Sequence, residues 1–126
     1  MIGFLLITHE QLGHSLMRCV EHVLGGLPPQ LASVAVMPAD DPAEVEASAR
    51  KALSLVDKGS GVIVFTDIAG ATPYNVACRL VTAGRVEGIT GVNLPMLLRG
   101  ITYRESPLAE VRDKTLAGGI SGVARF

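Results

Sequence analysis

Short, unbroken apolar runs placed at intervals along the chain constrain the fold more than any other feature of the sequence. Ile2–Ile7 and Val62–Phe65 contain no polar residue at all, rather than a polar residue at every second position. Such runs are typical of strands that are covered on both faces, as in a parallel sheet. Leu31–Val36 and Val86–Val92 are the third and fourth candidates. The sequence therefore predicts four strands.

Helical patterns fill the intervals between these runs. Apolar residues recur at helical spacing, and proline or glycine marks where the helices begin and end. The predicted helices run from Leu12 to Gly25–Gly26, from Asp41–Pro42 to Lys58–Gly59, from Thr72–Pro73 to Gly84, for a short stretch after Asn93–Pro95, and from Ser106–Pro107 to about Lys114. Asp41 and Thr72 are the expected N-caps, each followed by a proline at the first helical position.

Strands that alternate with helices predict βαβ units with right-handed crossovers. We therefore expect an α/β fold with an open parallel sheet in the flavodoxin-like order 2-1-3-4 and helices on both faces. The weakly alternating tail, Ile120–Phe126, is expected to add a C-terminal antiparallel edge strand. A length of 126 residues fits one domain that spans residues 1–126.

Charge and composition exclude several classes of function. The net charge of −1 and the scattered basic residues leave no basic stripe, so nucleic acid is not an expected partner. Ile2–Ile7 is too short to span a bilayer and lacks signal-peptide flanks, so we expect a cytoplasmic protein without direct membrane insertion. Cys19 and Cys78 are expected in the core, and His14 and His22 on a solvated helix face. No cofactor or metal site is predicted.

Polar side chains directly follow two of the predicted strands. His9 comes after the first strand and Asp67 after the third, and parallel strands that are neighbours bring such residues together in the crevice at their carboxyl ends. A carboxylate that accepts a hydrogen bond from one ring nitrogen fixes the tautomer of an imidazole and leaves the other nitrogen free as a nucleophile. His9 and Asp67 are therefore the predicted catalytic pair.

The segment after Asp67 is suited to an anion. Gly70, Ala71, Thr72 and Pro73 lead into a helix, whose first turn offers unpaired main-chain N–H groups and the positive end of the helix dipole. We predict that these four residues bind a phosphoryl group without the help of a lysine or a metal.

Three segments resemble the IIA component of the mannose family in the bacterial phosphoenolpyruvate-dependent sugar phosphotransferase system (PTS). They are Ile2–His9 with Leu12–Gly13, Asp67–Asn75 and Gly91–Leu97. Together they span most of the chain.

The resemblance implies a flavodoxin-like fold and a set of roles. His9 would accept a phosphoryl group from the phosphocarrier HPr and pass it to a IIB protein, while Asp67 binds the other ring nitrogen. Asn93, Leu94 and Pro95 would contact the partner protein. The resemblance also implies a homodimer in which the C-terminal strand crosses to the other subunit.

Two positions depart from the family pattern. Glu10 stands where relatives often have glycine, and its carboxylate would repel an incoming phosphoryl group. Ala71 stands where a second glycine is usual, and a left-handed conformation there would cost roughly 1 to 2 kcal/mol.

A regulatory role is the alternative function. In that case the phosphorylation state of His9 would control association with another protein, without coupling to sugar uptake. A response-regulator receiver is disfavoured because Thr8, His9 and Glu10 stand where acidic residues are needed. A flavin-binding module is disfavoured because no aromatic pair is placed to hold the ring.

Overall fold

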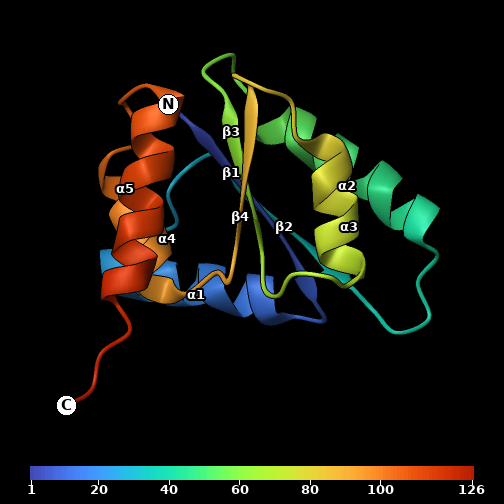
Figure 1. Cartoon of the computed structure of the whole chain (residues 1–126), viewed down its shortest axis with the longest axis horizontal. Coiled ribbons are helices and arrows are strands. Elements are labelled where there is room, and N and C mark those ends of the chain that lie inside the picture. The colour runs from blue at the N-terminus through green and yellow to red at the C-terminus, as the bar shows by residue number, and fades with distance from the viewer.

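All four strands form one parallel sheet in the order β2-β1-β3-β4. The computed structural model describes residues 1–126. The strands are β1 (Gly3–His9), β2 (Leu31–Val36), β3 (Val62–Thr66) and β4 (Val86–Thr90). The helices are α1 (Leu12–Leu24), α2 (Pro42–Val56), α3 (Thr72–Leu80), α4 (Leu94–Thr102) and α5 (Leu108–Ser121). Helices cover both faces of the sheet, as Figure 1 shows, so the predicted flavodoxin-like fold is confirmed.

The residues of β1 explain why its sequence is apolar throughout. Leu5 and Ile7 point to the face covered by α2 and α3, whereas Phe4 and Leu6 point to the face covered by α1, α4 and α5. All four side chains are buried. A central strand buried on both faces has no position for a polar side chain until it reaches the end of the sheet.

The helix starts agree with the sequence signals to within one residue. Asp41 is the N-cap of α2 and accepts a hydrogen bond from the N–H of Ala43 at 3.1 Å, as predicted. The N-cap of α3 is Ala71, without a side-chain cap, so the prediction that Thr72 caps this helix is wrong by one residue.

The C-terminal region differs from the prediction. Helix α5 continues to Ser121, well beyond Lys114, because Gly118 and Gly119 are contact points within the helix rather than a stop signal. A Cβ atom on either glycine would lie 2.4 Å from a side-chain carbon of α4. Because glycine has no Cβ atom, the two helices can pack closely. The antiparallel edge strand predicted over Ile120–Phe126 is not present, and the last residues leave the body of the molecule as an exposed tail (Figure 1).

A buried arginine ties the chain together at the amino ends of the strands. Arg104, only 3% exposed, donates hydrogen bonds to the main-chain oxygens of Ile2 at 2.9 Å and Gln30 at 3.0 Å. Its guanidinium carbon also lies 5.1 Å from the centre of the Phe4 ring. Burial lowers the pKa of Arg104 to about 10. This end of the sheet is therefore sealed, and the opposite end carries the polar side chains.

None of the five helices combines the length and the apolar character that a membrane-spanning segment needs.

Candidate functional site

The two central strands place His9 and Asp67 next to each other. Strands β1 and β3 are paired, with Ile7 opposite Thr66, so the residues that follow them meet at the carboxyl edge of the sheet. From this point α1 turns to one face of the sheet and α3 to the other. A crevice forms where consecutive connections separate in this way, and it is the usual ligand site of open α/β sheets.

The imidazole and the carboxylate are in direct contact. The Nδ1 atom of His9 lies 2.9 Å from Oδ2 of Asp67, and the same oxygen accepts a hydrogen bond from the main-chain N–H of His9 at 3.0 Å. The other carboxylate oxygen accepts one from the N–H of Ile68 at 3.0 Å. The side chain of His9 is 48% exposed and that of Asp67 is 13% exposed. The carboxylate is therefore fixed and shielded, while the ring stays accessible to a large partner.

These contacts keep Asp67 ionised. Partial burial raises its pKa and is the largest single influence, but the hydrogen bonds from the His9 ring and from main-chain N–H groups together outweigh it. The net effect is that the pKa of Asp67 is lowered from its ordinary value. An ionised carboxylate can only accept, so in the neutral form of the His9 ring the proton is on Nδ1 and the lone pair is on Nε2.

The predicted phosphate-binding segment forms the turn before α3 and the first two residues of that helix. Gly70 adopts a left-handed conformation with φ of +86° and is exposed. Thr72, the first residue of α3, lines the same hollow as His9, whereas Pro73 is buried beneath it. Pro73 has no N–H to give, so the main-chain donors of this segment lie on either side of it.

The strained conformation in this region falls on Glu10 rather than on Ala71. Ala71 is extended, with φ of −118°, so alanine costs nothing at that position. Glu10 has φ of +49°, in the left-handed region that favours glycine. Its N–H donates a hydrogen bond to the main-chain oxygen of Val36 at 2.9 Å, which holds the turn against β2.

A hollow of about 320 Å³ lies beside His9. Its lining residues are His9, Glu10, Val36, Met37, Pro38, Asp40 and Thr72. The end of β2 and the β2–α2 connection, which together supply four of them, were missed by the sequence reasoning. They could have been found from topology, because β2 is paired with β1 and its carboxyl end must lie at the same edge.

Asn93, Leu94 and Pro95 lie at the start of α4, on the same edge of the sheet but outside this hollow. The side chain of Asn93 accepts a hydrogen bond from the N–H of Met96 at 2.9 Å and donates one to the main-chain oxygen of Gly119 at 3.2 Å. Asn93 is therefore the N-cap of α4 and connects α4 to α5. Among Asn93, Leu94 and Pro95, only Pro95 is exposed.

The two cysteines are exposed and unpaired, so the prediction that they are core residues is wrong. In α1 the buried residue is Val20, which directly follows Cys19. In α3 the core face carries Val76, Ala77 and Leu80. Cys19 and Cys78 both lie just beside these faces. The structure has no cluster of three or more His, Cys, Asp or Glu side chains that could hold a metal ion.

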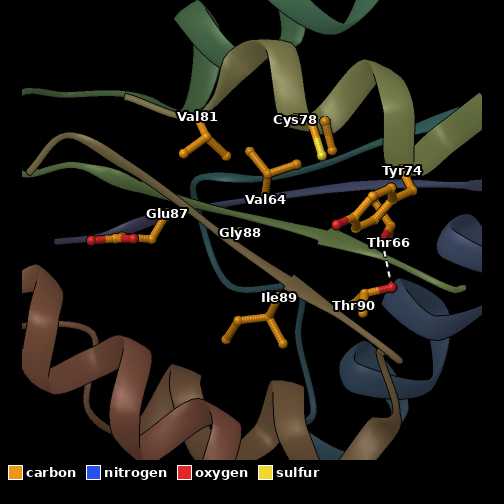
Figure 2. A pocket seen from close by; sticks show the side chains of 10 residues that line it. Val64, Thr66, Tyr74, Cys78, Val81, Glu87, Gly88, Ile89 and Thr90 are labelled. Carbon is orange, nitrogen blue, oxygen red and sulfur yellow. Dashed lines mark hydrogen bonds between the residues drawn. The ribbon is translucent and has the colours of Figure 1, made fainter. Parts of the chain in front are cut away.

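A groove of about 330 Å³ runs along β4 on the α3 side of the sheet. Figure 2 shows Tyr74 and Cys78 of α3 above it, and the hydrogen bond from the Thr66 hydroxyl to the Thr90 hydroxyl, 2.8 Å long, below. Strand β4 is at the edge of the sheet, and Gly88 in its middle is exposed. Apart from an isolated antiparallel bridge between Thr82 and Val86, nothing in this chain pairs with that edge.

Comparisons with known proteins identify the family of the chain. The putative phosphotransferase enzyme IIA component YadI of Escherichia coli (strain K12) is 41% identical over 75 residues. This match covers 58% of the chain and 51% of YadI, so the chain spans about half the length of the curated relative it matches.

Two solved structures share the fold over the whole chain. The phosphotransferase system component EIIA of Streptococcus agalactiae superposes with a TM-score of 0.88 at 20% identity and covers 100% of this chain and 98% of its own. The mannose/sorbose specific IIA subunit of Enterococcus faecalis superposes with a TM-score of 0.84 at 21% identity and covers 99% of this chain and 94% of its own. The family model EIIA-man, described as PTS system fructose IIA component, matches residues 3–115. The chain therefore belongs to the EIIA-man family of PTS IIA components.

Proposed function

We propose that this protein is a PTS phosphocarrier that accepts a phosphoryl group from phospho-HPr on His9 and transfers it to a IIB protein. The contact between Nδ1 of His9 and Asp67 carries this proposal, because it leaves Nε2 as a free nucleophile on a half-exposed ring. Membership of a family of PTS IIA components supports the same role.

The proposed reaction is a direct transfer between two nitrogen atoms. The lone pair of Nε2 attacks phosphorus, the P–N bond of phospho-HPr breaks, and its electron pair stays on the donor imidazole. The His9 ring then carries a positive charge and keeps its proton on Nδ1. The carboxylate of Asp67, 2.9 Å away, stabilises this charge. Attack by the nucleophile of a IIB protein on the same phosphorus reverses these changes and restores the neutral ring.

The turn before α3 supplies donors for the phosphoryl oxygens in this proposal. The proposed donors lie at the start of α3, where the helix dipole favours an anion. They are the main-chain N–H groups of Gly70, Ala71 and Thr72 and the hydroxyl of Thr72. Pro73 contributes by starting the helix rather than by donating a bond. Neutral donors stabilise the phosphoryl group without holding it as a metal would, which suits a carrier.

We further propose that the protein is a homodimer in which the exposed tail of one copy pairs with β4 of the other. Val123 is 78% exposed and Phe126 is fully exposed, so the tail offers apolar side chains that a partner can cover. The groove along β4 is largely apolar, and the strand edge is unpaired beyond the bridge between Thr82 and Val86, so it offers main-chain groups for strand addition. The part of the predicted strand that lies beyond α5, residues 122–126, would then form only in the dimer. Sedimentation of the chain and of a truncation after Ser121 tests this, since only the truncation should be monomeric at micromolar concentration.

A transfer experiment tests the phosphocarrier role. The parent chain, His9→Ala and His14→Ala are incubated with the general phosphotransferase enzyme, HPr and radiolabelled phosphoenolpyruvate. His14 is an exposed histidine of α1 and serves as the matched control. We expect acid-labile label on the parent and on His14→Ala but none on His9→Ala. Equal labelling of His9→Ala would refute the proposal.

A second step separates the carrier from the regulatory alternative. The labelled protein is mixed with IIB proteins from the same organism, and a carrier loses its label to one of them. Label that stays on His9 while the phosphorylated form alone captures another protein would favour the regulatory role.

A further inference from the structure

The hollow beside His9 is lined by acidic side chains and by no basic one. Glu10 and Asp40 contribute carboxylates, and the chain's 11 lysines and arginines are all absent from the lining. No ion pair of the structure includes Glu10 or Asp40. A phosphoryl dianion arriving at Nε2 therefore meets two negative charges that no lysine or arginine of the lining offsets.

The conformation of Glu10 is not the one its residue type prefers. Its φ of +49° is freely adopted by glycine and rarely by other residues. The hydrogen bond from its N–H to Val36 fixes the turn on one wall of the hollow, and Asp40 stands on the wall formed by the next loop. The main-chain N–H of Met37 donates to Asp40 at 2.8 Å, which holds that carboxylate in place. The turn thus favours glycine, and the chain places a carboxylate there instead.

We propose that Glu10, assisted by Asp40, selects the phosphodonor of His9. Repulsion between the carboxylates and a phosphoryl dianion slows any donor that brings only negative charge into the hollow. A protein that presents an arginine or lysine beside its own phosphoryl group replaces this repulsion with attraction. The hollow therefore accepts phosphoryl groups from a cationic protein surface and discriminates against small anionic phosphodonors. This inference rests on the proposed phosphorylation of His9.

A small donor provides the comparison that isolates this effect. Phosphoramidate transfers its phosphoryl group to imidazoles without any protein. The lone pair of Nε2 attacks phosphorus, the P–N bond of N-protonated phosphoramidate breaks, and the electron pair leaves with nitrogen as ammonia. The chemistry at His9 is the same as with phospho-HPr, but the donor has a net negative charge and no arginine or lysine side chain accompanies it.

The experiment measures initial rates of His9 labelling with each donor for the parent, Glu10→Gln, Glu10→Gly and Glu110→Gln. Glu10→Gln removes the charge and keeps the side chain, whereas Glu10→Gly also relaxes the main chain. Glu110, an exposed residue of α5, is the control for the loss of one charge. We expect both Glu10 variants to be labelled by phosphoramidate about three- to tenfold faster than the parent, the range for one carboxylate and a dianion roughly 8 Å apart in water. With phospho-HPr at low salt, the Glu10 variants should instead be labelled more slowly than the parent. Their labelling rates should also change less with salt concentration than the rate of the parent.

Opposite changes with the two donors are the signature of donor selection, because a merely structural role would move both rates in the same direction. Changes of less than twofold, changes in the same direction, or an effect confined to Glu10→Gly would each overturn the inference. In all three cases a labelled parent leaves the proposed function standing. A parent that neither donor labels on His9 would refute the proposed function itself.

Discussion

Replacing Asp67 with asparagine should slow the phosphorylation of His9 by roughly one to three orders of magnitude. The substitution keeps the shape of the side chain and an oxygen that can accept from the ring, but it removes the negative charge 2.9 Å from Nδ1. Two opposite unit charges about 4 Å apart attract by about 1 kcal/mol in water and about 4 kcal/mol near a protein surface. Asp67 is 13% exposed and His9 is 48% exposed, which places this pair between those limits. Each 1.4 kcal/mol lost in the transition state costs about tenfold in rate.

Rapid-quench labelling by phospho-HPr measures this rate. Asp57→Asn is the matched control, because Asp57 is also shielded, at 17% exposed, and its carboxylate also bonds to a side-chain nitrogen, that of Arg85, at 3.0 Å. Asp57 precedes β3 and lies at the opposite end of the sheet from Asp67. Both variants should remain folded in thermal unfolding. If Asp67→Asn were labelled within twofold of Asp57→Asn, the role assigned to the Asp67 charge would be refuted.

Three further predictions concern stability. Arg104→Met should lower the free energy of unfolding in urea by roughly 2 to 4 kcal/mol, since two main-chain oxygens lose a charged donor, and a change below 0.5 kcal/mol, roughly the size of a surface substitution, would contradict this. Gly3→Ala should lower the free energy of unfolding by about 1 to 3 kcal/mol, because the new Cβ would lie 2.3 Å from the main-chain oxygen of Val56. Gly26→Ala, with open space around it, should be tolerated. Similar melting temperatures for the two variants would count against the packing argument. The lowered pKa of Asp67 means that its contribution to stability is full above the ordinary carboxyl range near about 4 and is lost as the pH falls through the lowered pKa. The gap in melting temperature between parent and Asp67→Asn should therefore be constant above about pH 5 and close in acid, and a gap independent of pH would rule this out.

Much of the architecture could be predicted because each strand carries its own signal. Ile2–Ile7 and Val62–Phe65 are apolar throughout since both faces of β1 and β3 are buried. Once these two strands are neighbours, the positions of His9 and Asp67 follow from chain direction alone. The resemblance to the mannose-family IIA component was confirmed by the family match over residues 3–115.

The features that the sequence did not reveal depend on tertiary packing. Gly118 and Gly119 resemble a helix stop, yet in α5 they allow close contact with α4, and only the position of that neighbouring helix distinguishes the two cases. The left-handed conformation is at Glu10 and not at Ala71. The N–H of Glu10 bonds to the main-chain oxygen of Val36, which lies in a strand distant in sequence, so the local sequence does not reveal this contact. Cys78 is exposed because no strand covers the outer edge of β4.

Nitrogen and phosphorus NMR of the phosphorylated protein tests the central claim most directly. The claim is that Asp67 holds the proton on Nδ1 of His9 and thereby makes Nε2 the atom that receives the phosphoryl group. The spectra should show phosphorus coupled to Nε2 of His9 and a proton retained on Nδ1. Phosphorus bonded to Nδ1, or to any residue other than His9, would contradict the account.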